Sequence, residues 1–194
     1  MSAVLSPQEL KVKKYSNEDI RSISKLREEF AKAMLRLLGI EVEPVGKGTL
    51  SEEVFEGFHE SEEDRFDFKC EELGIIFEVT GTSWTRRRSA ERYDPDWEEE
   101  GRRKPSPRKA VLAVLKRKVD DAFAMGVQDR LYFVSVNDGQ GEWRFMPCNL
   151  VRKYPFGRYA SMEGEYYLIP WENWRTPDWM RKKIEELRQK KSKR

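Results

Sequence analysis

Two carboxylates occupy matching positions of a predicted β-hairpin. Asp67 lies in the run 65–70, Glu78 lies in the run 75–80, and a turn over 71–74 separates them. Side chains at i and i+2 of a strand share a face, so Asp67 points with Lys69, and Glu78 with Thr80. If the two strands pair, the carboxylates are neighbours that repel each other unless a positive charge lies between them. Mg²⁺ accepts one or two carboxylates with waters and phosphate oxygens, and Mn²⁺ is its usual substitute.

A structural ion pair is the alternative to a metal site. The run 75–79 is almost wholly apolar or β-branched, which is typical of a buried central strand. A charge in such a strand needs a partner or a metal. If the carboxylates form a structural ion pair, Lys69 is the candidate partner. Otherwise Lys69 is an ordinary surface lysine.

Helices and further strands must hold this hairpin in place. A first helix is expected to begin at Ser16 or Asn17, to end at Gly39, and to turn inward the apolar residues Ile20, Ile23, Leu26, Phe30, Met34, Leu37 and Leu38. A second helix is expected from Ser106-Pro107 to Gly126, with an apolar stripe of Val111, Leu115, Val119, Ala122 and Phe123. Strands are expected at 131–136, 142–146 and 166–169, and a last helix begins at Thr176-Pro177. This order predicts one α/β domain over 1–194, with helices flanking a mixed central sheet.

The order and the acidic pair resemble the PD-(D/E)XK nuclease superfamily, which includes restriction enzymes and archaeal Holliday-junction resolvases. That family has a helix, a hairpin with Asp on one strand and Glu-x-Lys on the next, then a helix and a strand. The separation of Asp67 and Glu78 (78 − 67 = 11) fits its pattern, and the resemblance covers about residues 18–146. It implies a restriction-endonuclease-like fold, metal ligation by Asp67 and Glu78, and a helical acidic residue near the site, which Glu28 or Glu29 matches.

Thr80 departs from the pattern, because the family has a lysine at this position. In one interpretation another lysine replaces it, with Lys69 the first choice and Lys109 or Lys116 next. In the other, the chain has lost its chemistry and is a nucleic-acid-binding or assembly module. The corresponding expectations are a Mg²⁺-dependent DNA endonuclease and an inactive nuclease fold. A chance match of the hairpin in an unrelated protein is a third possibility.

The segment 81–108 is rich in basic residues and aromatic rings, and it follows the acidic pair directly. Arginine forks match phosphate geometry and rings stack on bases, so the segment is expected to contact nucleic acid, more specifically DNA. Internal salt bridges with its acidic residues are the alternative. The expected phosphate-binding residues are Arg86, Arg87, Arg88, Arg102, Arg103, Lys104 and Arg108.

The composition limits the remaining function classes. A net charge of +2 means that nucleic-acid binding depends on local clusters, such as the basic end at 181–194, rather than on a global field. Two distant cysteines and one histidine, His59, argue against a zinc site and suggest buried thiols in a cytoplasmic protein. No apolar run predicts a membrane span, and the richness in charged residues is typical of thermophile proteins. The tryptophans at 171, 174 and 179 are expected in the core, with a homodimer contact as the alternative.

Overall fold

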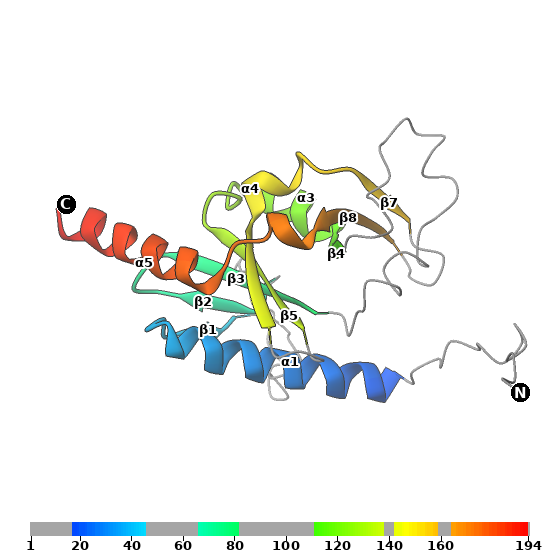
Figure 1. Cartoon of the computed structure of the whole chain (residues 1–194), viewed down its shortest axis with the longest axis horizontal. Helices are drawn as coiled ribbons and strands as arrows, with labels where there is room; N and C mark the ends of the chain where they lie inside the picture. Colours follow the sequence, from blue (N-terminus) through cyan, green and yellow to red (C-terminus); the bar gives the residue numbers. More distant parts are fainter. Residues whose placement is uncertain (1–16, 46–65, 82–110, 138–141, 159–163, 194) are drawn as a thin grey trace, which may run out of the picture.

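A computed structural model describes residues 17–45, 66–81, 111–137, 142–158 and 164–193 (Figure 1). The helices are α1 (Asn17–Leu37), α3 (Lys116–Ala124), α4 (Cys148–Val151), the 3₁₀ helix η4 (Trp171–Asn173) and α5 (Pro177–Ser192). The strands are β1 (Glu43–Pro44), β2 (Phe68–Cys70), β3 (Ile75–Gly81), β4 (Val111–Leu115), β5 (Leu131–Asn137), β6 (Glu142–Pro147), β7 (Phe156–Arg158) and β8 (Glu165–Pro170).

A five-stranded sheet lies at the centre, in the order β1-β2-β3-β5-β6. The pair β3–β5 is parallel, and every other neighbouring pair in this sheet is antiparallel. The sheet is therefore mixed, and helices flank it, which confirms the predicted α/β class. A second sheet of three antiparallel strands, β4-β8-β7, was not predicted.

The central sheet separates two hydrophobic cores. One face packs against α1 and α5 through Leu35 and Ile184, and the other packs against β4, β8 and α3. Neighbouring residues of β3 show the alternation, since Phe77 belongs to the first core and Ile76 to the second. Figure 1 shows α1 along one side of the sheet and the second sheet on the other. Glu78 shares its face with Ile76 and so points toward the second core.

The second helix begins later than the sequence predicted. Val111–Leu115 is strand β4, which pairs with β8 from Val111↔Pro170 to Leu115↔Tyr166, and the helix occupies only Lys116–Ala124. Val111 and Leu115 fit a helical spacing, but a run of β-branched and apolar residues also fits a strand with a partner. Pairing with a strand more than 50 residues away decided between them. The predicted end is confirmed, because Gly126 has φ +69° just after the helix.

The inward face of α1 also differs from the predicted stripe. Leu26 and Leu37 are exposed, whereas Ala31, Leu35 and Leu38 are buried. Of the predicted stripe, Phe30, Met34 and Leu38 do face the first core, whereas Leu26 and Leu37 lie off the contact face. Ile20 and Ile23 lie where no side chains are described.

The C-terminal part confirms the sequence more closely. Thr176 caps α5 by accepting a hydrogen bond from the Trp179 amide (3.3 Å), and Pro177 is in the first turn. Trp174 is buried, while Trp171 and Trp179 pack on the second and first cores, respectively, so all three belong to the core as expected. Cys70 and Cys148 are buried free thiols. No helix in the described ranges has the length and apolarity needed to cross a bilayer.

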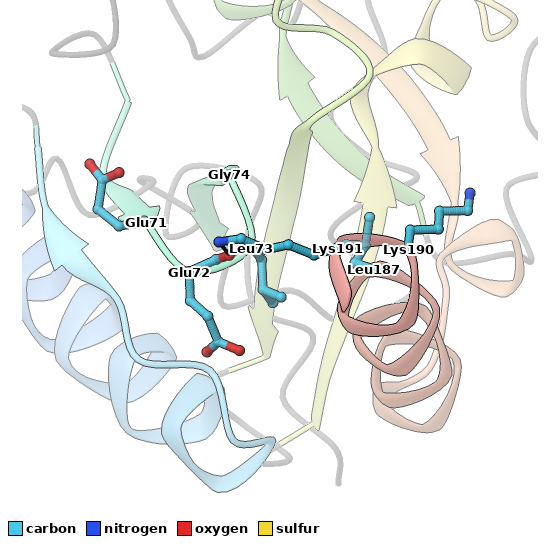
Figure 2. Close-up of a pocket in the computed structure, with 7 residues that line it drawn as sticks. All are labelled: Glu71, Glu72, Leu73, Gly74, Leu187, Lys190 and Lys191. Carbon is cyan, nitrogen blue, oxygen red and sulfur yellow. Dashed lines mark hydrogen bonds between the residues drawn. The ribbon is translucent and has the colours of Figure 1, made fainter. Parts of the chain in front are cut away.

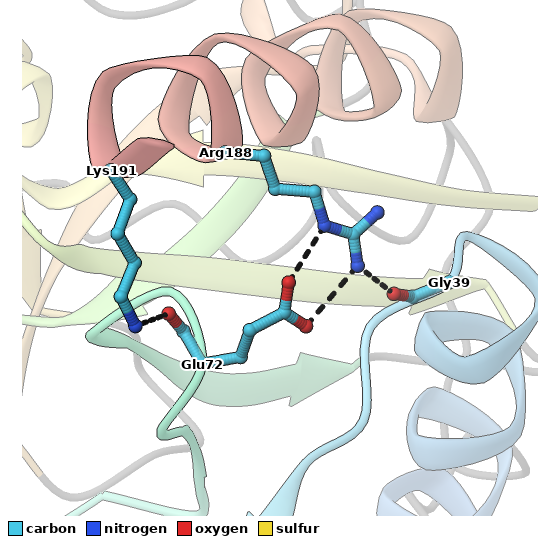
Figure 3. Close-up of polar contacts among 4 residues, drawn as sticks. All are labelled: Gly39, Glu72, Arg188 and Lys191. Atoms are coloured by element: carbon cyan, nitrogen blue, oxygen red, sulfur yellow. Dashed lines mark hydrogen bonds and ion pairs between the residues drawn. The ribbon is translucent and has the colours of Figure 1, made fainter. Parts of the chain in front are cut away.

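A polar clamp fastens α5 to the rest of the molecule. Arg188 donates from Nε to Glu72 Oε1 (2.8 Å) and from its terminal nitrogen to the Gly39 carbonyl (2.8 Å). Lys191 Nζ donates to the Glu72 carbonyl at 2.7 Å (Figure 3). The clamp therefore joins the end of α5, the β2–β3 turn and the end of α1.

Candidate active site

The hairpin brings Asp67 and Glu78 together. Asp67 immediately precedes β2, whose first residue Phe68 pairs with Phe77, and the Asp67 amide donates to the Phe77 carbonyl at 3.2 Å. Asp67 therefore lies beside Glu78, close enough for their charges to interact. The Val79 amide donates to Asp67 Oδ2 at 2.6 Å, which fixes the orientation of this carboxylate. The two carboxylates are neighbours, as the hairpin predicts, although regular strand alternation does not extend through Asp67, since Phe66 and Phe68 belong to different cores.

Both carboxylates are held in a form that resists ionisation. Burial raises the pKa of Asp67 to about 6, although the Val79 hydrogen bond and the Lys118 charge oppose the shift. Burial and then repulsion from Asp67 raise the pKa of Glu78 to about 8, against the lowering effect of Lys118. The Glu78 side chain is only 13% exposed. Two buried acids in contact favour a cation between them, because a cation stabilises the charged form of each.

Lys118 is the cation that contacts Glu78. Its Nζ lies 3.0 Å from Oε1 and 3.1 Å from Oε2, and 5.6 Å above the centre of the Phe66 ring. Sequence reasoning missed Lys118. Lys118 lies one turn before the buried Ala122, and this spacing indicates a side chain near the core. The spacing is informative only when the helix is known to begin at Lys116.

The structure brings the other predicted site residues to different partners. Lys69 forms an ion pair with Glu71 at 2.6 Å, and Lys116 forms one with Asp120, also at 2.6 Å. Lys109, His59 and the predicted phosphate-binding residues, from Arg86 to Arg108, lie outside the described residues. Their roles remain predictions.

Thr80 links the two sheets. Its hydroxyl donates to the Ala113 carbonyl of β4 at 3.1 Å. Because β4 leads directly into α3, this bond also positions the helix that carries Lys118. Thr80 therefore supports the element that brings Lys118 to Glu78.

Glu28 adds a third acidic group beside the pair. It is 7% exposed, whereas Glu29 is exposed, and its charge raises the pKa of both Asp67 and Glu78. Among the described residues, no three His, Cys, Asp or Glu side chains are arranged to hold one metal ion. Asp67 and Glu78 thus form an acidic pair, and the charge of Glu28 strengthens the negative field around them.

The chain matches the Viral/Archaeal nuclease family over residues 20–183, a range that includes Glu28, Asp67, Glu78 and Lys118. The chain belongs to this viral/archaeal nuclease family. It is also similar to "Uncharacterized protein D-244" of Sulfolobus spindle-shape virus 1, with 29% identity over 170 residues, 79% of this chain. The chain spans 62% of the length of that relative.

A solved structure described as D212, a nuclease from a fusselovirus, is similar to this chain with a TM-score of 0.48 and 19% identity. The similarity covers 91% of this chain and 96% of that one.

Proposed function

We propose that this chain is a metal-dependent endonuclease that hydrolyses phosphodiester bonds in DNA, with Mg²⁺ bound by Asp67 and Glu78. The observation that carries the proposal is the largely buried carboxylate pair, with Asp67 just before β2 and Glu78 in β3, in a member of a nuclease family. A pure binding surface for a polyanion gains nothing from two buried carboxylates, because they repel phosphate. A cation-binding site explains both their burial and their pairing.

The donor set suits a hard divalent cation. Carboxylate oxygens are its preferred ligands, and the raised pKa of both groups supports a site that would gain from a further positive charge. Lys118 supplies part of this compensation, through direct contact with Glu78 and through its charge at Asp67. When bound, Mg²⁺ supplies Lewis acidity toward a phosphate oxygen and a bound water of lowered pKa.

The protein's own residues would then divide the remaining work. The Val79 amide holds Asp67 in one rotamer, so this carboxylate is oriented before anything binds. Lys118 leaves Glu78 for the phosphate or the attacking water, the role that the resemblance assigns to a lysine on β3. Thr80 holds β4, and with it α3, at the distance that allows this contact.

Cleavage of duplex, branched and single-stranded DNA with Mg²⁺ or Mn²⁺ tests the proposal. Wild type is expected to cut at least one substrate, and Asp67→Ala and Glu78→Ala to cut none. Lys118→Ala should lose most activity, while Lys116→Ala, two residues away and paired with Asp120, serves as the matched control. If Lys118→Ala cuts as well as wild type and Lys69→Ala does not, the lysine is assigned wrongly.

An inactive binding module is the second candidate, favoured by one specific contact. Lys118 already neutralises Glu78 within 3.1 Å, so the pair is satisfied in part without a metal. In that case wild type binds DNA but cuts nothing, and neither Mg²⁺ nor Mn²⁺ binds at the acidic pair. Calorimetry with Mn²⁺ on wild type and Asp67→Ala separates the two functions.

A further inference from the structure

An apolar stripe runs along the side of α1 that faces away from the central sheet. Leu26 and Leu37 are 65% and 77% exposed, and Ala33 between them is exposed as well. Phe30 completes the stripe at its border with the first core, where its side chain is only partly buried. A single exposed leucine is ordinary, whereas neighbouring apolar side chains along one side of a helix mark an interaction surface.

The spacing of the stripe is that of a helix that packs against another helix. Leu26, Phe30, Ala33 and Leu37 are separated by four, three and four positions, as the a and d positions of a heptad are. At 3.6 residues per turn they fall within about 60° of arc, on the side of α1 opposite its buried residues. One partner helix can therefore contact all four side chains at once.

A second copy of α1 in antiparallel orientation complements the stripe by size. A two-fold axis that sets Leu26 against Leu37 of the second copy also sets Phe30 against Ala33 of that copy, since 26 + 37 = 30 + 33 = 63. Each large ring then meets a small methyl group, and each leucine meets a leucine, so the side chains interdigitate. A contact of this kind uses the same surface on both copies, as two-fold interfaces do.

The charges beside the stripe complement each other in the same arrangement. Glu29 and Arg36 directly precede Phe30 and Leu37, so they lie on one flank, and the two-fold axis brings Glu29 of each copy beside Arg36 of the other. Within the described part of the chain, no ion pair engages Glu29.

Arg36 has one ion pair, which leaves this contact accessible. Its Nε lies 3.5 Å from Glu41 Oε2, and the two side chains are 63% and 77% exposed, so the pair contributes little. In a parallel helix pair, the residue that faces Glu29 is Met34, at the e position of the next heptad. The charges therefore favour the antiparallel arrangement.

The pocket at α5 shows the contrast with a surface that is already covered (Figure 2). It measures about 350 Å³ and lies between the β2–β3 turn and α5, lined by Glu71, Glu72, Leu73, Gly74, Leu187, Lys190 and Lys191. Its two leucines are partly buried against the first core. Among the described residues, the large apolar side chains that remain exposed are Leu26 and Leu37 of the stripe.

We propose that the stripe on α1 is a two-fold interface through which two copies of this chain associate, with their α1 helices antiparallel. Figure 1 shows α1 along an edge of the molecule, beside the sheet, so a second helix has access to its outer side. The interface goes beyond the proposed nuclease function and does not depend on it. Glu28 is buried on the other side of α1, so each copy keeps its own acidic pair.

Sedimentation equilibrium of the full chain, without DNA or metal, tests the interface. Wild type is expected to dimerise as its concentration rises. Leu26→Lys and Leu37→Lys should each weaken association about 100-fold or more, because a symmetric interface loses two buried leucines and gains two charges. Both positions are exposed in the single copy, so the variants should stay folded. Gln189→Lys, which adds a charge to an exposed position of α5, is the matched control and should dimerise like wild type.

A charge exchange tests the flank of the interface. Glu29→Lys is expected to weaken the dimer about 5-fold, and adding Arg36→Glu in the same chain should restore it, because the two opposite charges then meet in reverse. Glu185→Lys, on an exposed position of α5, should have no effect. If the double variant associates more weakly than Glu29→Lys alone, Glu29 and Arg36 do not meet across the interface.

Cysteine variants test the orientation of the helices. A mixture of Leu26→Cys and Leu37→Cys should form an intermolecular disulfide, while neither protein alone should. In the antiparallel pair, identical positions lie 11 residues apart, which is roughly 16 Å along the axis and beyond the reach of a disulfide. Cys70 and Cys148 are buried and give little background.

The remaining outcomes overturn the interface. A disulfide in either cysteine variant alone would show a parallel pair. A wild type that stays monomeric at every concentration would mean that no second copy binds the stripe, including the case in which another segment of the same chain covers it. Cleavage of DNA is measured separately, so the nuclease proposal stands or fails independently of these results.

Discussion

The contact between Lys118 and Glu78 sets a lysine and a metal in competition for one carboxylate. The ammonium lies 3.0 Å from Glu78, so a cation that binds there must displace it. We predict that Lys118→Gln binds Mn²⁺ more tightly than wild type, by about 10-fold or less, yet cleaves DNA more slowly. The opposite directions follow because the ammonium opposes metal binding in the resting site but assists the reaction. Calorimetry and a cleavage assay measure the two effects.

Lys116→Gln controls for the loss of a positive charge on the same helix. Its partner is Asp120 rather than the acidic pair, so neither Mn²⁺ affinity nor the metal dependence of cleavage should change by more than about 2-fold. If Lys118→Gln binds Mn²⁺ more weakly than wild type, Lys118 supports the metal rather than competing with it.

The raised pKa values of the acidic pair also give a pH dependence of stability. Asp67 has a pKa of about 6 against an ordinary 3.8, and Glu78 one of about 8 against 4.5, so the folded state binds more protons than the unfolded state between these values. Their contribution to stability is therefore fully present below about pH 4 and is lost as pH rises to about 8. In metal-free buffer, the acidic pair should therefore lower the urea denaturation midpoint of the protein as the pH rises from about 4 to about 8.

Asp67→Asn isolates that contribution. The amide removes one titrating group and the repulsion that raises the pKa of Glu78, so the decline with pH should flatten and move to lower pH. Urea titrations at pH 5, 6, 7 and 8 for both proteins measure it, with Asp178→Asn on exposed α5 as control. Parallel curves for wild type and Asp67→Asn would contradict the assignment.

Much of the site was predictable at the level of single residues, and the exception has a physical reason. The pairing of Asp67 with Glu78 follows from the two-residue period of strands and a short turn, which are local. The lysine was not predictable in the same way. Lys118 reaches Glu78 only because β4 pairs with a strand from the end of the chain, a contact no local pattern encodes.

Among the elements, β4 is where local preference and tertiary contact disagreed. Val111 and Leu115 suit a helix by spacing, but β8 and the Thr80 hydroxyl both engage β4 as a strand. Elements with local signals, such as the hairpin and the Thr176–Pro177 helix start, were predicted correctly. The short strand β7 and the helix α4 were missed, because neither carries a periodic pattern long enough to read.

The bond between Thr80 and Ala113 should be measurable as a link between the two sheets. Thr80→Val keeps the shape but removes the donor to the Ala113 carbonyl, and we predict a loss of about 1 kcal/mol in unfolding free energy. Cleavage should fall as well, because α3 and Lys118 follow β4. Thr80→Ser keeps a hydroxyl and is the control. A Thr80→Val protein as stable and active as wild type would show that the bond positions nothing.

At the scale of the molecule, the Arg188 clamp joins α5 to the β2–β3 turn and to the end of α1, which are far from α5 in sequence. The clamp lies at the end of the hairpin away from the acidic pair. Arg188 and Glu72 are both about half exposed, so the pair is worth only about 0.2–1 kcal/mol. We predict that Arg188→Ala lowers the melting temperature by about 2–4 °C or less and leaves Mn²⁺ affinity unchanged. Differential scanning calorimetry with and without Mn²⁺ checks both. Arg181→Ala, whose ion pair with Asp178 lies within α5, controls for the loss of a helix arginine. A changed Mn²⁺ affinity would mean that α5 communicates with the site.

Metal binding should stabilise the folded state of the whole molecule. Asp67 directly precedes β2, Glu78 lies in β3, Glu28 comes from α1 and Lys118 from α3, so these groups meet only when the hairpin and both helices are assembled. The unfolded chain offers no such site, and a ligand that binds only the folded state adds RT ln(1 + [L]/Kd) to its stability. We predict a gain of about 2.7 kcal/mol when Mn²⁺ is at 100 times its Kd, measured as a shift in the thermal midpoint.

Two variants decide whether that gain comes from the acidic pair. Glu78→Gln removes one ligand and should abolish the shift, although its metal-free midpoint is expected to stay near or above that of wild type at pH 8, where the buried charge is relieved. Glu71→Gln, on the same hairpin but paired with Lys69, should keep the full shift. An equal Mn²⁺ shift in wild type, Glu78→Gln and Glu71→Gln would show that the ion binds elsewhere. A site that uses both Asp67 and Glu78 loses one of its two carboxylate ligands in Glu78→Gln, so its Mn²⁺ shift cannot stay the same.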